Sequence, residues 1–324
     1  MKTKLLFRSL IAFAALIVAS ISFANDAPEV SVAMALAMNE LAEKELIKHF
    51  RHAGTWLARV PSKNNWVNND VIKLTDIGAD PAVLINNNTY PINVSSRADD
   101  SVVVSLYKYD TENTKISDDE VYALPYDKVG SVQMQHRETL EEETEAHALH
   151  SLAPIEDSTN TPVIVTTGEL VDGRRRLISA DLVTLKKKLD LLKVPKAGRC
   201  LVLSADHIAD LLLEDKKLDV QYQNHTDGMI ARNYYGFELY ESVFSPVYSA
   251  AKAKIAYGSA TEGLAASILF HAKTTAKARG TVKRYMGKAE DDPQNRETVV
   301  GFRLYFLAIP MRAKGQGAII DATE

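Results

Sequence analysis

The sequence contains little cysteine, glycine, proline or tryptophan. Among its 324 residues are one cysteine, 15 glycines, 11 prolines and two tryptophans. A single cysteine excludes an intramolecular disulfide and any zinc site built from several cysteines, and we interpret Cys200 as a core thiol in an apolar strand. The low glycine and proline content excludes collagen-like and proline-rich disordered chains. The composition, 46% apolar and 25% charged, is that of a globular protein with one large domain or two to three subdomains.

The short motifs of common enzymes are also missing. No GxxxxGK[ST], GxGxxG, GxSxG or HExxH pattern occurs. Glu143, His147 and His150, spaced i, i+4 and i+7, share a helix face that could bind a divalent metal. We interpret them as a solvated polar face, because no second carboxylate-rich helix is present. His207 is interpreted as polar decoration of a first helical turn, and Ser204 as a helix cap. We therefore predict no enzyme, with no catalytic, cofactor-binding or metal-binding residues.

An excess of positive charge is absent as well. Lysine and arginine number 38 against 42 aspartates and glutamates, a net charge of −4, which argues against a strongly basic nucleic-acid-binding domain. The densest basic clusters are Arg174–Arg176 and Lys186–Lys188. Both are expected to be solvated, although such clusters can contact phosphates or acidic partners.

The first 24 residues resemble a secretory signal peptide. Lys2, Lys4 and Arg8 precede an uncharged segment, Ser9–Ala24, whose last three residues form a small-x-small cleavage pattern. Without this leader, lysine and arginine fall to 35 against 42 acids, a net charge of −7. No later stretch approaches 18 apolar residues, so we expect the mature chain to be soluble, with no membrane span.

Hydrophobic periodicity, caps and turn signals predict the remaining elements. The stretch from 61 to 109 is polar, rich in β-prone pieces and low in core-forming residues, which predicts a protruding β-excursion. Pro154 is expected to end the longest helix. The predicted helices cover residues 29–50, 126–152 and 181–192, and a fourth follows Ser204. The predicted strands cover residues 71–74, 83–85, 92–94, 101–109, 163–165, 200–203, 237–240, 254–257, 279–286 and 297–309, and residues 265–270 form a further apolar segment.

Several short segments occur in a characteristic order between residues 124 and 320. The main ones are LPYDK at 124–128, HSLAP at 150–154, VPKAGR at 194–199, QYQNHTDG at 221–228, YGFELYE at 235–241, DDPQN at 291–295 and FRLYF at 302–306. In their order and spacing these segments resemble the major capsid proteins of tailed bacteriophages, especially those of phages that infect Bacteroidetes, including the crAss-like group. No single segment is diagnostic, so the likeness rests on the whole series.

This resemblance implies an α+β fold, the Hong Kong-type phage capsid fold. Such proteins have an N-terminal arm, a long hairpin called the E-loop, a peripheral domain with a spine helix, and an axial domain near the capsomer centre. The excursion at 61–109 suits an E-loop, and the longest helix suits the spine. The expected boundaries are 1–24 for the leader, 25–60 for the arm, 61–125 for the E-loop, 126–175 for the peripheral domain, 176–262 for the axial domain and 263–324 for strands returning to the peripheral domain.

The implied function is structural. Copies would form the hexamers and pentamers of an icosahedral shell enclosing phage double-stranded DNA, with the portal and other virion proteins as partners, non-specific DNA contact and no cofactor. In the resembled family, residues 221–228 lie in the axial domain. Because this stretch is polar and ends in glycine, we expect an exposed loop. The residues expected to contact the adjacent subunit are Tyr222, Asn224, His225 and Asp227.

The signal-like N-terminus disagrees with capsid assembly, which takes place in the host cytoplasm. Translation could begin downstream at Met34 or Met38, or residues 1–24 could be a pro-sequence. Alternatively, the chain is an exported periplasmic or surface binding protein. We favour the first two explanations, and hence localisation in the virion, because the capsid resemblance covers more of the chain than the leader does.

Overall fold

The computed structural model describes residues 56–68, 70–76, 88, 90–92, 100–123, 127–223, 229–259 and 261–323. The leader, the helix predicted at 29–50 and the strand predicted at 83–85 lie outside these residues, as does most of the strand predicted at 92–94. The chain divides into two compact units. The described part of the first comprises Thr114–Met134 and Gly287–Val299, and all other described residues belong to the second. No helix among the described residues is long and apolar enough to cross a membrane.

A seven-stranded mixed sheet forms the centre of the second unit. Its order is β10-β11-β9-β13-β16-β6, and β12 pairs with β13. Every residue of β9 is buried, as expected for an apolar strand covered on both faces. The sheet confirms the strands predicted at 163–165, 200–203 and 237–240, and the apolar segment at 265–270 forms a strand within it. The strands are β6 (Val163–Val165), β9 (Arg199–Leu203), β10 (Met229–Tyr234), β11 (Phe237–Glu241), β12 (Val247–Tyr248), β13 (Leu264–His271) and β16 (Gly317–Ile320).

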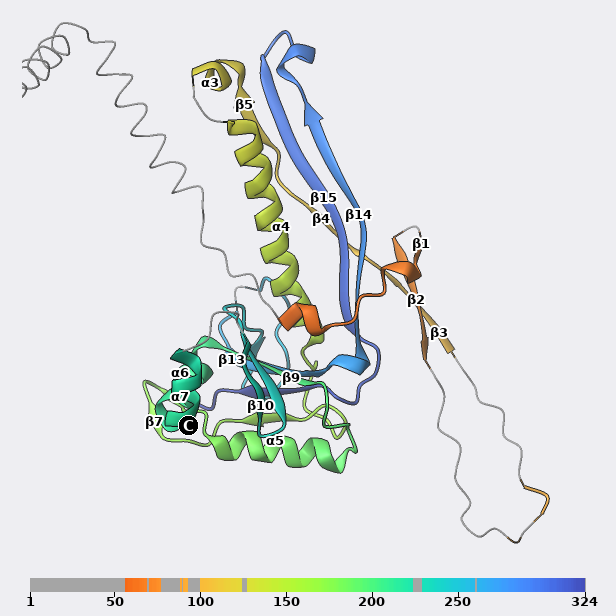
Figure 1. Cartoon of the computed structure of the whole chain (residues 1–324), viewed down its shortest axis with the longest axis vertical. Helices are drawn as coiled ribbons and strands as arrows, with labels where there is room; N and C mark the ends of the chain where they lie inside the picture. Colours follow the sequence, from red (N-terminus) through yellow and green to blue (C-terminus); the bar gives the residue numbers. More distant parts are fainter. Residues whose placement is uncertain are drawn as a thin grey trace, which may run out of the picture. The chain divides into compact units, whose positions relative to one another are not determined.

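Helices cover the two faces of this sheet (Figure 1). The C-terminal half of α4 (Lys128–Leu152) packs on the face that carries Cys200 and Val202. On the other face, α5 (Ser179–Leu191) packs with Leu201 and Leu203, together with α6 (Ala205–Glu214) and α7 (Lys216–Gln223). Since successive side chains of a strand point to opposite faces, β9 contributes to both apolar cores.

Local capping accounts for the helix boundaries. The helix predicted at 126–152 begins at Lys128, because the Asp127 carboxylate accepts the Gly130 N–H at 2.8 Å, and it ends at Leu152, before Pro154. Ser204 caps α6 as predicted, its hydroxyl accepting the backbone N–H of His207 at 3.4 Å. The main helices of the described chain were therefore readable from local sequence signals.

One acidic residue of α4 lies inside the fold. Glu145 is buried, and its Oε1 accepts the Nε1–H of Trp56 at 2.8 Å. Trp56 begins η1 (Trp56–Arg59) and also packs edge-on against the Phe270 ring. A hydrogen bond to the indole compensates for the burial of the carboxylate.

Two long strands, β14 (Thr275–Gly287) and β15 (Glu297–Pro310), confirm the pair predicted at 279–286 and 297–309. They form a sheet in the order β14-β15-β4, and a further strand pairs with β15. The register of β15 with β4 (Tyr107–Asp110) places Arg303 opposite Asp110, and these side chains form an ion pair at 2.5 Å. Two other predicted strands differ from the structure: the one at 101–109 is divided into two strands, and the one at 254–257 does not form.

The strand predicted at 101–109 divides at Leu106. Residues on either side form β3 (Asp100–Ser105) and β4, which belong to different sheets. The Leu106 N–H donates to the Asp70 carbonyl at 2.9 Å, and the Leu106 side chain is buried with Leu307. The hydrogen bond continues the β2–β3 register by one residue, and the buried side chain packs on β15, so the chain passes from one sheet to the other at Leu106.

The strand predicted at 254–257 is absent. Only Lys254 forms an isolated bridge, with Tyr248. Gly258 has a φ of 72°, and the Ser259 N–H donates to the Ala256 carbonyl at 3.2 Å. The backbone therefore turns where a strand would need to stay extended.

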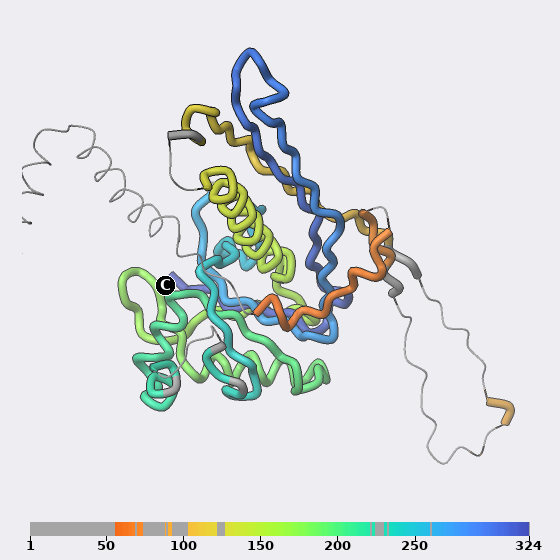
Figure 2. Tube along the Cα trace, turned by 45° about the horizontal axis from the view of Figure 1, so that its top comes forward, coloured from red at the N-terminus to blue at the C-terminus, as the bar shows by residue number. Residues whose placement is uncertain are grey.

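The excursion begins with β1 (Val67–Asn68) and β2 (Val71–Asp76), which form a three-stranded antiparallel sheet with β3. Its apolar contacts gather at the base, where buried Ile72 packs with residues of β14 and β15. The preceding segment runs along β14, with the Lys63 N–H donating to the Lys277 carbonyl at 2.8 Å. Figure 2 shows this segment in orange.

The described part of the first unit is small and rich in ion pairs. It contains β5 (Thr114–Ser117), α3 (Asp118–Ala123), the first turns of α4 and η4 (Ala289–Asp291). Lys115 pairs with Glu297 at 3.0 Å, and Lys128 pairs with Glu120 at 2.9 Å. Ile116 provides a fully buried apolar side chain.

Candidate functional sites

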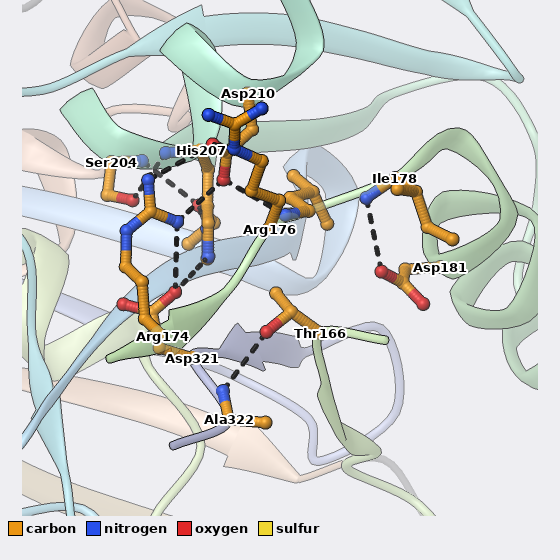
Figure 3. Close-up of polar contacts among 12 residues, drawn as sticks. Thr166, Arg174, Arg176, Ile178, Asp181, Ser204, His207, Asp210, Asp321 and Ala322 are labelled. Atoms are coloured by element: carbon orange, nitrogen blue, oxygen red, sulfur yellow. Dashed lines mark hydrogen bonds and ion pairs between the residues drawn. The ribbon is translucent and has the colours of Figure 1, made fainter. Parts of the chain in front are cut away.

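The arginine cluster contacts acidic side chains of the same chain. Arg174, in β8 (Arg174–Arg175), donates through NH1 and NH2 to the two oxygens of Asp210, at 2.6 and 3.1 Å. The buried Asp210 carboxylate also accepts the Leu177 N–H at 3.0 Å (Figure 3). Arg176 lies 3.8 Å from the same carboxylate. The expectation of a solvated basic loop is therefore wrong for Arg174, which forms a bidentate pair.

His207 is the centre of a second polar chain. It is fully buried, with Nδ1 2.6 Å from the Ser267 hydroxyl and Nε2 2.9 Å from Oδ1 of Asp321. Figure 3 shows His207 between α6 and the end of the chain. The interpretation of His207 as solvent-facing decoration was wrong. Its neighbours Ile208 and Leu211 mark the buried side of α6, a signal that was present in the sequence.

Serine, histidine and aspartate are the residue types of a hydrolase triad, but here Ser267, His207 and Asp321 are buried and link separate elements of the fold. Ser267 is fully buried, and its hydroxyl accepts the Ser204 N–H at 3.0 Å while contacting Nδ1 of His207. With Nε2–H donated to Asp321, Nδ1 accepts the hydroxyl proton, so each polar group has a partner. These hydrogen bonds connect α6 and β13 to Asp321, the residue that follows β16.

The histidines of the possible metal face lie among tyrosines. The His147 ring centroid is 4.8 Å from that of Tyr107 and 4.8 Å from that of Tyr257. The Tyr109 hydroxyl hydrogen-bonds to Nδ1 of His147. The imidazole is therefore held by β4 on one side and by the turn at residues 255–259 on the other.

The other two members of that face also have partners. His150 contacts the Ile255 carbonyl through Nε2 at 2.8 Å, and Glu143 accepts the Tyr257 hydroxyl at 2.7 Å. Within the described ranges, no group of three or more histidine, cysteine, aspartate or glutamate side chains is placed to hold a metal ion. The spacing along α4 brings these three residues to one side, where they bond to β4 and to the turn at residues 255–259.

Burial sets the electrostatics of this cluster. It lowers the pKa of His147 and His150 below the usual histidine value and lowers the pKa of Lys254 to about 8. The Lys254 amine donates to the carbonyls of His150 and Ala153 at 2.8 and 2.9 Å. A cation at this position interacts favourably with the C-terminal end of the α4 dipole.

A cavity of about 330 Å³, which we call the α4 pocket, lies beside the cluster. It is formed by one face of α4, the segment leading into β12 and the turn that follows β12. Its lining combines apolar and aromatic side chains with one imidazole and several hydroxyl groups. The lining residues are Ala146, His150, Val243–Val247, Ile255–Ser259 and Thr261.

The predicted subunit-contact residues are only partly described. Tyr222 lies in α7, so the loop expected over 221–228 is wrong for its first three residues. Its side chain is half-buried, and its hydroxyl donates to Glu241 at 3.1 Å. Leu218, one helical turn earlier, is buried and anchors α7, which extends the helix into the polar stretch. Asn224, His225 and Asp227 lie outside the described residues.

Cys200 is fully buried in β9, with no disulfide partner. Burial raises the pKa of its thiol to about 12, which keeps it protonated and unreactive at neutral pH. This agrees with the interpretation of Cys200 as a core thiol.

No protein-family model matches this sequence, and no curated protein matches it significantly. Solved structures do match. A chain of Mycobacterium phage Che8 is 12% identical, with a TM-score of 0.58 over 84% of this chain and 93% of that one. The capsid of the cyanophage P-SCSP1u is 13% identical, with a TM-score of 0.57 over 84% of this chain and 89% of that one. The mature capsid of bacteriophage PhiM1 is 12% identical, with a TM-score of 0.57 over 84% of this chain and 88% of that one.

This likeness establishes the fold. The chain has the α+β Hong Kong-type fold of phage capsid proteins, as the sequence resemblance implied. At 12–13% identity, sequence alone would not have established it.

Proposed function

We propose that this protein is the major capsid protein of a tailed bacteriophage, whose copies self-assemble into an icosahedral shell around double-stranded DNA. The observation that carries the proposal is coverage. The fold extends over 84% of this chain and over 88–93% of the phage chains compared with it. A shared subdomain would match a smaller part of each partner, so the likeness concerns nearly the whole subunit.

The proposal includes hexamers and pentamers, the portal and other virion proteins as partners, and assembly in the host cytoplasm. It also includes the domain boundaries expected above and a relationship to the crAss-like phages of Bacteroidetes. The order of the quoted segments supports that narrower relationship. Contact with packaged DNA would be non-specific, with Lys186–Lys188 among the contributors, because the chain is acidic overall.

Exposed apolar side chains on β14 support a role in assembly. The strand is at the edge of its sheet, and its outer half exposes Val282, Tyr285 and Met286. Exposed edges and apolar side chains are hazards in a monomer and are useful where another subunit covers them.

Size measurement tests the proposal. Residues 34–324 and the full chain should be produced separately and compared by sedimentation and electron microscopy. Shells, sheets or ring-shaped capsomers are expected for at least the shorter chain. A monomer at every concentration, together with recovery of the full chain from the periplasm, would contradict the proposal and favour an exported binding protein.

The proposed subunit-contact residues need a test that respects the position of Tyr222. Replacing Tyr222 by alanine would remove its bond to Glu241 and part of its packing, so His225→Ala is the cleaner variant. We expect His225→Ala to reduce capsomer formation while circular dichroism stays unchanged. If histidines converge on one axis, wild-type assembly should weaken near and below pH 6.5, and the variant should not. Unchanged shells and pH dependence would place residues 224–227 outside the interface.

A further inference from the structure

The α4 pocket has an apolar side, a polar side and acidic neighbours. Val243, at the pocket, is 56% exposed, and Phe244 and Val247 line the wall. Glu143 bonds to the lining residue Tyr257, and the exposed Glu262 follows the lining residue Thr261. The nearby Lys254 amine is directed to helix carbonyls. The pocket therefore suits an apolar side chain surrounded by positive charge.

The C-terminal end of α5 has the complementary character. Leu191 is 74% exposed, and the lysines around it are Lys187, Lys188 and Lys193. The neighbouring acid, Asp190, is paired with Arg199 at 2.7 Å. This end of the helix thus presents a large apolar side chain among cations.

The pocket and this end of α5 cannot meet within one copy. Ala148, Leu149 and Leu152 of α4 pack on one face of the seven-stranded sheet, whereas Leu185 and Leu189 of α5 pack on the opposite face. The sheet therefore separates them (Figure 1). Two complementary patches on opposite faces of a subunit are the requirement for a head-to-tail contact, which closes into a ring when the rotation allows.

We propose that the end of α5 of one copy binds the α4 pocket of a second copy, with Leu191 in the cavity and the lysines facing Glu143 and Glu262. In this arrangement Lys187 and Lys188 contact the second copy instead of DNA. This contact rests on the proposed function, since it requires assembly. A volume of about 330 Å³ is at the lower end of ligand-site sizes and suits a side chain better than a larger molecule.

Disulfide trapping tests the contact directly. Cys200 is buried with a raised thiol pKa, so engineered cysteines will be the reactive ones. Leu191→Cys and Val243→Cys proteins should be co-assembled and mildly oxidised. A reducible dimer is expected from the mixture and not from either protein alone. Leu213→Cys, at a 69%-exposed position on α6, mixed with Val243→Cys is the matched control and should give no dimer.

The outcomes separate this contact from the proposed function. If shells form from the mixture but neither Val243→Cys nor Ser245→Cys is crosslinked to Leu191→Cys, the contact is wrong and the capsid proposal stands. If no assembly of any kind forms from the wild-type chain, the proposed function itself fails. Two pocket positions are needed because a disulfide forms only when the Cα atoms lie within about 7 Å.

Charge reversal gives an independent test. Lys187→Glu and Glu262→Lys should each raise the critical assembly concentration by about two- to fivefold, the range for an exposed charge pair. A chain that carries both changes should have a critical assembly concentration close to that of the wild-type chain. Additive losses in the double variant would contradict the pairing, as would normal shells from both single variants. If Lys187→Glu only reduces DNA retention in normal shells, the lysines face DNA instead and the contact is wrong.

Discussion

The seven-stranded sheet and the outer half of β14 differ in how completely one chain buries them. In the sheet, every residue of β9 is buried, and helices cover both faces. In β14, residues 281–286 are exposed on both faces, with Val282 45% and Tyr285 46% accessible. A strand needs cover on at least one face to contribute stability. The sheet is therefore complete within a single copy, and the outer half of β14 leaves apolar surface uncovered.

The comparison extends to the excursion formed by β2 and β3. Its buried side chain, Ile72, is at the base, and Val103 on β3 is 57% exposed. Among the described residues, the edge of β14 is covered near its start, where the Lys277 N–H donates to the Pro61 carbonyl at 2.9 Å. Stability and assembly should consequently depend on different parts of the chain, which the following experiments can confirm or refute.

Deleting residues 69–96 should have the largest effect, and that effect should be confined to assembly. The seven-stranded sheet and its two cores do not include this segment, so circular dichroism and cooperative unfolding should persist. Shells should be absent in electron micrographs, because cover over a neighbouring subunit is lost. If the deleted chain fails to fold to the same extent as it fails to assemble, the excursion belongs to the core and the comparison is wrong.

Phe270→Ala should lower the free energy of unfolding by about 3–5 kcal/mol in urea titrations of the unassembled subunit. The ring is fully buried and packs against Trp56, so its removal leaves a cavity. Val103→Ala is the matched control from the excursion and should change the value by less than about 0.5 kcal/mol. Similar losses from both variants would remove the distinction between the regions.

His207→Ala should lower the free energy of unfolding by about 1–3 kcal/mol, since it leaves the buried Ser267 hydroxyl and Asp321 carboxylate without their shared partner. The loss should be non-additive with Asp321→Asn in a double-mutant cycle. Full additivity would mean that the polar chain does not act as a unit.

The smallest expected effect concerns pH. Burial holds the pKa of His147 and His150 in the folded chain below the ordinary histidine value of about 6.5. At a pH between the lowered pKa and the ordinary one, the unfolded chain therefore binds more protons than the folded chain. Their contribution to stability is therefore complete above about pH 6.5 and is lost as the pH falls toward the folded values. His147→Gln/His150→Gln should show a shallower decline from pH 7 to 5 in chemical denaturation. An identical slope would show that nearby carboxylates, such as Glu143, dominate.

Some predictions succeeded because their signals are local. The helix predicted at 126–152 ends at Leu152 because a proline follows, and β9 follows from an unbroken apolar run. Others failed where the deciding residue is distant. The predicted strand divides at Leu106, whose side chain is buried with Leu307 of another sheet, and Glu145 is buried beside Trp56, 89 residues away. Periodicity carries no information about such partners.

By itself, the sequence determined many of the longer helices and buried strands, such as α4, α5 and β9, since breakers and apolar spacing act within a few residues. Only the tertiary structure decided the roles of the polar residues. Arg174 meets Asp210, and His207 meets Asp321 across 114 residues, because the sheet brings its last strand beside α6. The physical reason is that a buried charge or imidazole requires a partner, and the fold alone sets which distant group is near enough to provide one.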